Sequence, residues 1–116
     1  MTRVPFAFDL KDGFVSVRGV AFLDGDDLVI ETARTLIGLV PVGRRTFRLP
    51  ADEVESIDVR TTRFGRVQLV VRPFSFSFLH GFPGDPADEL VLPLARKHRD
   101  DARALARDVR LRNLPR

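Results

Sequence analysis

Few side chains of this chain could catalyse a reaction, and they lie far apart in the sequence. The 116 residues include two histidines and no cysteine. His80 and His98 lie in unrelated segments, without the His-x-Glu or His-x-x-x-His spacing that is typical of metal-dependent catalysis. Ser75 and Ser77 lack the Gly-x-Ser-x-Gly pattern of a nucleophilic serine, and no Gly-Lys-Ser/Thr phosphate loop is present. The sequence therefore predicts a protein that is not an enzyme and that uses no cofactor and no metal ion.

An apolar segment flanked by arginines, residues 34–45, is the strongest candidate for binding. Apolar side chains beside cations suit the edge of a membrane, where the apolar groups insert and the cations meet anionic head groups. The same composition suits a protein interface, and a third possibility is that the apolar side chains fold back onto the core. The candidate binding residues of this segment are Arg34, Leu36, Ile37, Leu39, Val40, Arg44 and Arg45.

A row of arginines on the predicted C-terminal helix is the second candidate. At about 100° per residue, the arginines from Arg96 to Arg110 fall within about a quarter of the helix circumference. They could bind phosphate groups, or their aliphatic stems could shield a sheet. Because the helix has no aromatic side chain to stack on a base, nucleic acid is not an expected partner. The candidate binding residues of this row are Arg103, Arg107 and Arg110.

A predicted turn supplies the third candidate, which consists of Arg63, Phe64 and Arg66. A phenylalanine between two arginines could be an exposed contact point, or it could tuck inward beneath the turn.

Short strands followed by one helix are the elements that would position these residues. Asp24-Gly25-Asp26 predicts a hairpin turn, although its carboxylates could instead hold calcium without the usual twelve-residue pattern. Residues 38–43 are predicted as a loop or distorted hairpin tip, and Pro93 places the last strand at an edge or bulge. The predicted strands are residues 14–22, 27–34, 44–49, 55–62, 67–72, 74–78 and 89–94.

Two apolar patterns predict what fills the core. Ala102, Leu105, Ala106 and Val109 fall on one narrow helix face, which predicts a helix that plugs the open end of a bent sheet. Phenylalanines alternate with serines over residues 74–78, and they could line a cavity for a small apolar ligand or fill the interior completely.

Length and composition limit the number of domains and the location of the protein. The length predicts one domain over residues 1–116, with strands between about 6 and 95 and a helix at about 97–112. The net charge is +3 and comes almost entirely from arginine. No apolar run is long enough to span a bilayer, and the first residues do not resemble a signal peptide. We expect a cytoplasmic protein, with peripheral attachment at the inner membrane face as the second possibility.

Two segments carry a resemblance to a known family. One is Asp27-Leu28-Val29-Ile30 followed by residues 48–59, RLPADEVESIDV; the other is Leu90-Val91-Leu92-Pro93-Leu94 leading into Ala102-Arg103-Ala104-Leu105. In this order of elements the chain resembles bacterial pleckstrin-homology-like (PH-like) domains and their GRAM-like relatives. The resemblance implies a mainly β, α+β fold, namely a PH-like split barrel of about seven antiparallel strands capped by one C-terminal α-helix.

The resemblance also implies a function, a non-catalytic scaffold that binds lipid or protein. Phosphoinositide-binding relatives carry basic residues around the first hairpin loop, whereas residues 23–27 here are acidic, so a phosphate there would be repelled. We therefore expect a binding or adaptor domain that mediates protein–protein interaction or self-association. The alternative is peripheral binding to anionic membrane lipids through the segment 34–45.

Overall fold

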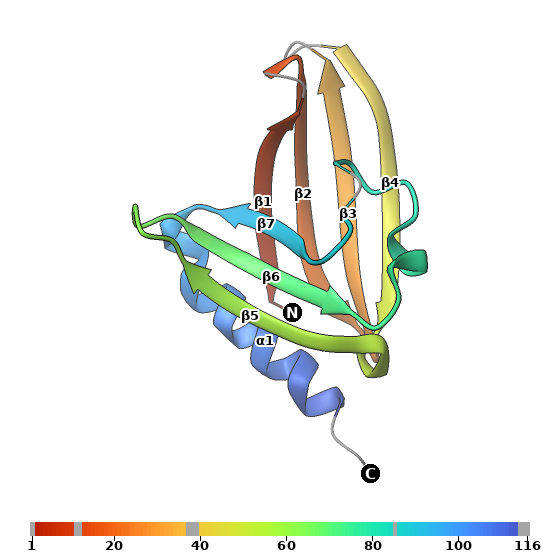
Figure 1. Cartoon of the computed structure of the whole chain (residues 1–116), viewed down its shortest axis with the longest axis vertical. Helices are drawn as coiled ribbons and strands as arrows, with labels where there is room; N and C mark the ends of the chain where they lie inside the picture. Colours follow the sequence, from red (N-terminus) through yellow and green to blue (C-terminus); the bar gives the residue numbers. More distant parts are fainter. Residues whose placement is uncertain (1, 11–12, 37–39, 85, 114–116) are drawn as a thin grey trace.

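Two antiparallel sheets and one C-terminal helix make up the fold (Figure 1). The computed structural model describes residues 2–10, 13–36, 40–84 and 86–113. Within these residues, the seven strands form a four-stranded sheet in the order β1-β2-β3-β4 and a three-stranded sheet in the order β5-β6-β7. The strands are β1 (Arg3–Leu10), β2 (Val15–Asp24), β3 (Asp27–Leu36), β4 (Val40–Pro50), β5 (Val54–Thr61), β6 (Val67–Pro73) and β7 (Leu90–Leu94).

The two sheets cross one another and enclose the core without closing into a barrel (Figure 1). Side chains alternate between the two faces of each strand, so every second residue of the crossing segments points inward. The buried core joins Ile30 and Phe47 of the first sheet to Leu69 and Leu92 of the second. The predicted mainly β fold with one C-terminal helix is therefore confirmed.

The β2–β3 hairpin forms where the Asp-Gly pattern predicted it. Asp24 pairs with Asp27, which leaves a two-residue turn, and Gly25 adopts a positive φ of 61° there. A positive φ strains residues that carry a Cβ, which is why glycine suits this position.

The β3–β4 hairpin extends further than the sequence predicted. Pairing continues to Leu36 opposite Val40, with a shift of register between Arg34 and Thr35. Of the two predictions for residues 38–43, the distorted hairpin tip is therefore confirmed from Val40 onward and the loop is wrong there, because backbone pairing with β3 outweighs the breaking effect of Pro41 and Gly43. Residues 37–39 lie outside the described residues.

The predicted strand 74–78 was also wrong, since its centre is the 3-10 helix η3 (Phe76–Leu79). The Ser75 hydroxyl accepts a hydrogen bond from the Ser77 backbone N–H at 3.3 Å, which caps the turn. Phe74 is exposed, and Phe76 packs against the core from outside. The alternation of phenylalanine and serine imitated a strand, while β1, which begins at Arg3, was absent from the predicted segments.

The C-terminal helix buries the face that its sequence pattern predicted. A short 3-10 turn, η4 (Arg96–His98), leads into α1 (Arg99–Arg112), whose buried residues are Ala102, Leu105, Ala106 and Val109. The helix packs mainly against β5 and reaches β1 and β2, so it bridges the two sheets. Beyond its end, the Asn113 side-chain amide donates to the Val54 carbonyl at 2.7 Å. Pro93 lies in β7, an edge strand of its sheet, as predicted.

Two leucines of α1 provide a matched test of this packing. Leu105 is 1% exposed and Leu111 is 58% exposed. We expect Leu105→Ala to lower the free energy of unfolding by about 2–5 kcal/mol, because it removes buried methyl groups and leaves a cavity. Leu111→Ala should change it by less than about 0.5 kcal/mol. Urea unfolding followed by circular dichroism measures both, and equal losses would contradict the assigned buried face.

Candidate functional site

One end of the four-stranded sheet projects beyond the second sheet (Figure 1), and apolar side chains are exposed there. Val40 and Val42 of β4 are 55% and 51% exposed, and Leu36 of β3 is also exposed. Phe14 precedes Val15, the partner of Leu36, in the β1–β2 turn, and it is 61% exposed. We call Phe14, Leu36, Val40 and Val42 the distal patch.

Strand register explains why Leu36 and Val40 of the distal patch continue from the core. Leu10, Val15, Leu36 and Val40 are successive partners across the four strands. Because paired residues share a face, these side chains form one row on the same face as Phe6 and the rest of the core. The second sheet is too short to cover this row. The interpretation that Leu36 and Val42 fold back onto the core is wrong, because both side chains are exposed, whereas Ile37 and Leu39 lie outside the described residues.

Two of the predicted binding arginines hold a loop in place. Arg34 and Arg45 both donate to the Gly81 carbonyl, at 3.2 and 3.3 Å, and Arg45 also lies over the Phe47 ring at 5.2 Å. Gly81 has a positive φ of 81°, and a Cβ there would collide with the Arg45 guanidinium. These contacts tie the loop after η3 to the inner face of the first sheet.

Arg44 points the opposite way, to the outer face of the same sheet. It is paired with Ala33, which is in turn paired with Arg18 of β2. Neither arginine makes a hydrogen bond or ion pair with another described residue. A shallow groove runs between them over Glu31, Ala33 and Thr46. The segment 34–45 is thus divided between two faces.

Two arginines of the helical region, Arg96 of η4 and Arg110 of α1, fasten it to the second sheet. Arg110 donates to the Ile57 carbonyl at 2.5 Å and to the Asp58 carboxylate at 2.6 Å. Arg96 donates to the Gly65 carbonyl at 3.1 Å. Arg103 lies in a groove beside Asp58 and Arg110, whereas Arg107 is exposed. These contacts favour the interpretation of the row as a shield over β5.

The third candidate, the β5–β6 turn, lies at the left edge of the view in Figure 1, away from the projecting end of the first sheet. Phe64 is 83% exposed, with the Arg63 guanidinium 6.0 Å from its ring, so it does not tuck inward. The Arg66 backbone N–H donates to the Thr62 hydroxyl at 3.1 Å. The structure therefore does not bring this turn together with segment 34–45.

The acidic hairpin turn is neutralised from within the chain. Arg48 contacts Asp24 at 2.8 Å and Asp27 at 3.4 Å, and Arg112 lies 3.8 Å from Asp26. The hydrogen bond to Asp24 raises the pKa of the Arg48 guanidinium. The carboxylates that could have held calcium thus have arginine partners. Over the described ranges, no three His, Asp or Glu side chains cluster as a metal site would require.

One charged cluster was missed by the sequence analysis. On the outer face of the second sheet, Glu89 accepts from Arg60 at 2.6 Å and from Arg72 at 3.3 Å. The hydrogen bond from Arg60, followed by that from Arg72, lowers the pKa of the Glu89 carboxyl. Glu89 precedes β7, so the cluster links this strand to β5 and β6. No local signal reveals it, because its members are far apart in sequence.

Comparison with protein-family models, curated proteins and solved structures finds no match for this chain. Among the described residues, no helix has both the length and the apolar character needed to cross a membrane.

The Glu89 cluster makes the stability of the fold depend on pH. The pKa of Glu89 is lower in the folded than in the unfolded chain, so the ionised carboxylate stabilises the folded state. This stabilisation is fully present above the unfolded pKa of about 4.3 and is lost as the pH falls through the folded pKa. We expect Glu89→Gln to lower the urea midpoint at pH 7 and to leave it nearly unchanged at about pH 2.

Glu55→Gln is the control, because Glu55 is exposed and makes no ion pair with a described residue. A midpoint that falls equally at both pH values in Glu89→Gln would show that the loss is not electrostatic.

Proposed function

We propose that the chain is a non-catalytic binding module, similar to bacterial PH-like domains, that associates with a second copy of itself through the distal patch. The resemblance is supported by the order of elements, four strands, then three strands, then one helix against both sheets. The single observation that carries the interaction is the exposure of Phe14, Leu36, Val40 and Val42 at one projecting end.

The edge of β4 provides a second contact surface beside the distal patch. β4 lies at the edge of its sheet, and all residues from Val40 to Thr46 are exposed. An uncovered edge strand offers unpaired backbone groups to another strand. In a dimer with two-fold symmetry both copies use the same surface, so β4 of one copy would pair with β4 of the other. Pro41 and the register shift near Arg34 limit the length of such pairing.

The positions of the charges favour a protein partner over an anionic membrane. Arg34 and Arg45 are engaged with the Gly81 carbonyl, which leaves Arg44 as the segment's arginine without a described partner. Asp9 is close to the same end, where it accepts from Ser16. Each basic side chain near an anionic surface contributes about 1 kcal/mol, so one free arginine gives weak attraction.

Sedimentation velocity over about 1–200 μM tests self-association. We expect a concentration-dependent dimer whose affinity falls more than tenfold in Val40→Asp, because a carboxylate would be buried in the interface. Leu111→Asp is the matched control, since Leu111 is equally exposed but lies on α1. A chain that stays monomeric over the whole range would overturn the proposal.

Flotation with vesicles distinguishes the membrane alternative from self-association. We expect no binding to neutral or anionic vesicles at physiological salt. Binding to anionic vesicles alone, weakened by salt and by Arg44→Glu, would instead support a membrane-surface module.

A further inference from the structure

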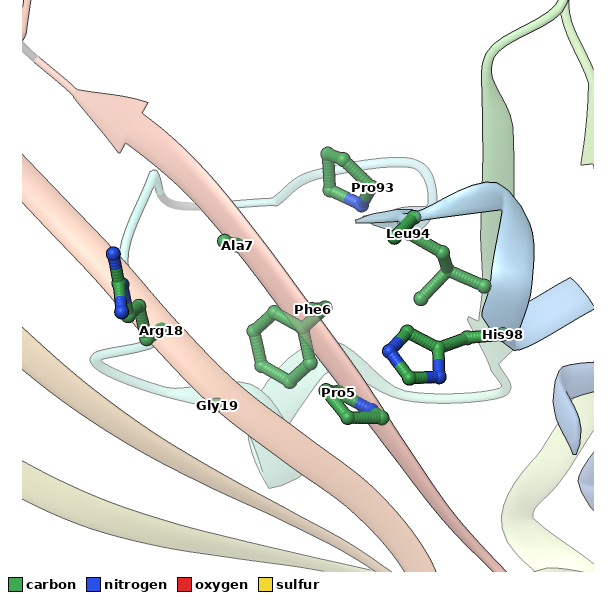
Figure 2. Close-up of a pocket in the computed structure, with 9 residues that line it drawn as sticks. Pro5, Phe6, Ala7, Arg18, Gly19, Pro93, Leu94 and His98 are labelled. Atoms are coloured by element: carbon green, nitrogen blue, oxygen red, sulfur yellow. The ribbon is translucent and has the colours of Figure 1, made fainter.

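A pocket of about 590 Å³ occupies the seam where the edge of β1 faces the edge of β7 (Figure 2). Its volume falls within the range of about 300–1,000 Å³ that is usual for small-molecule sites. Pro5, Phe6 and Ala7 of β1 form one side. Pro93 and Leu94 of β7, with His98 at the start of the helical region, form the other.

The sequence of the two facing edges keeps the seam open. Pro5 and Pro93 lack a backbone N–H, so each edge has one donor fewer for pairing across the seam. Ala7 has a small side chain and is exposed, which leaves space above β1. Gly19 allows the Phe6 ring to lie against β2, because a Cβ at this position would overlap the ring. The Phe6 ring thus lies on the core-facing side of β1, and the exposed apolar floor beside the seam is formed by Pro5 and Ala7.

The ionisable side chains around this floor are both basic. Arg18 and His98 are the ionisable residues of the lining, and no carboxylate is among them. They lie on opposite sides of β1 (Figure 2). Neither side chain makes a hydrogen bond or ion pair with another described residue. An arginine without a partner beside an apolar surface is complementary to a carboxylate on an apolar body.

We propose that the seam pocket binds a small monocarboxylate with an apolar body. The carboxylate contacts the Arg18 guanidinium, and the apolar part lies over Pro5 and Ala7 toward Leu94 and His98. This site is separate from the distal patch, so the inference goes beyond the proposed self-association.

Titration with octanoate, followed by the imidazole proton resonances, tests the site directly. The chain has two histidines, so His98 reports on the pocket and His80 serves as the internal reference. We expect a saturable shift of the His98 resonances and none at His80. Each buried methylene strengthens binding about fourfold, so octanoate, with two more methylenes, should bind about fifteenfold more tightly than hexanoate. Octanol should bind about tenfold more weakly than octanoate, because it lacks the charge-assisted hydrogen bond to Arg18.

Three variants separate the two parts of the site. Arg18→Gln should weaken octanoate about tenfold and leave octanol unchanged. Ala7→Leu should weaken both, because the larger side chain fills the space over β1. Arg107→Gln, which removes an exposed arginine of α1, should change neither.

Several outcomes would overturn the inference. Acetate binding as tightly as octanoate would reduce the site to a simple anion contact, and equal affinity for octanol and octanoate would remove the role of Arg18. A His98 shift with anionic vesicles but not with free octanoate would assign the ligand to a bilayer. Val40→Asp should bind octanoate normally, so failure of self-association and failure of this site are distinguishable.

Discussion

The contact between α1 and the open side of the two sheets is the interaction on which the rest of the structure depends. Ala102 and Ala106 are small enough for the helix backbone to approach the strands closely, and Leu105 and Val109 fill the space between β5 and the first two strands. Because the sheets do not close on themselves, this apolar face seals one side of the core. The helix therefore determines how the second sheet lies across the first, and so which parts of the first sheet remain uncovered.

Both candidate surfaces arise from the difference between the two sheets. The strands of the first sheet have 8 to 11 residues, whereas those of the second sheet, β5, β6 and β7, have 8, 7 and 5. Short strands cover only part of a long sheet, so the apolar row that ends in Leu36 and Val40 extends past the core. The seam between β1 and β7 has the same origin, since a three-stranded sheet with a proline at its edge does not complete a barrel.

Arginine acts in this chain mainly as a donor to its own backbone and carboxylates. Several guanidinium groups bind carbonyls that lie 36 to 87 residues away in sequence, including those of Arg45, Arg110 and Arg112. One planar group with five N–H donors can serve several acceptors at once, which suits it to this role. Exposed pairs of this kind contribute little stability singly, but they decide which arginines stay available for a ligand. The local density of positive charge is therefore a poor guide to binding.

The sequence by itself determined those elements that depend on the pattern of neighbouring residues. The helix and its buried face follow from the spacing of Ala102, Leu105, Ala106 and Val109, and the β2–β3 turn follows from Asp24 and Gly25. The same local patterns failed at Ser75, whose hydroxyl caps a turn, and at Val40, which pairs with a distant strand. Only the tertiary structure decided that Arg34 and Arg45 meet Gly81, that Arg18 and His98 flank one seam, and that Phe14 joins the distal patch. The physical reason is that burial and pairing between residues tens of positions apart depend on how the sheets cross, which no short stretch of sequence encodes.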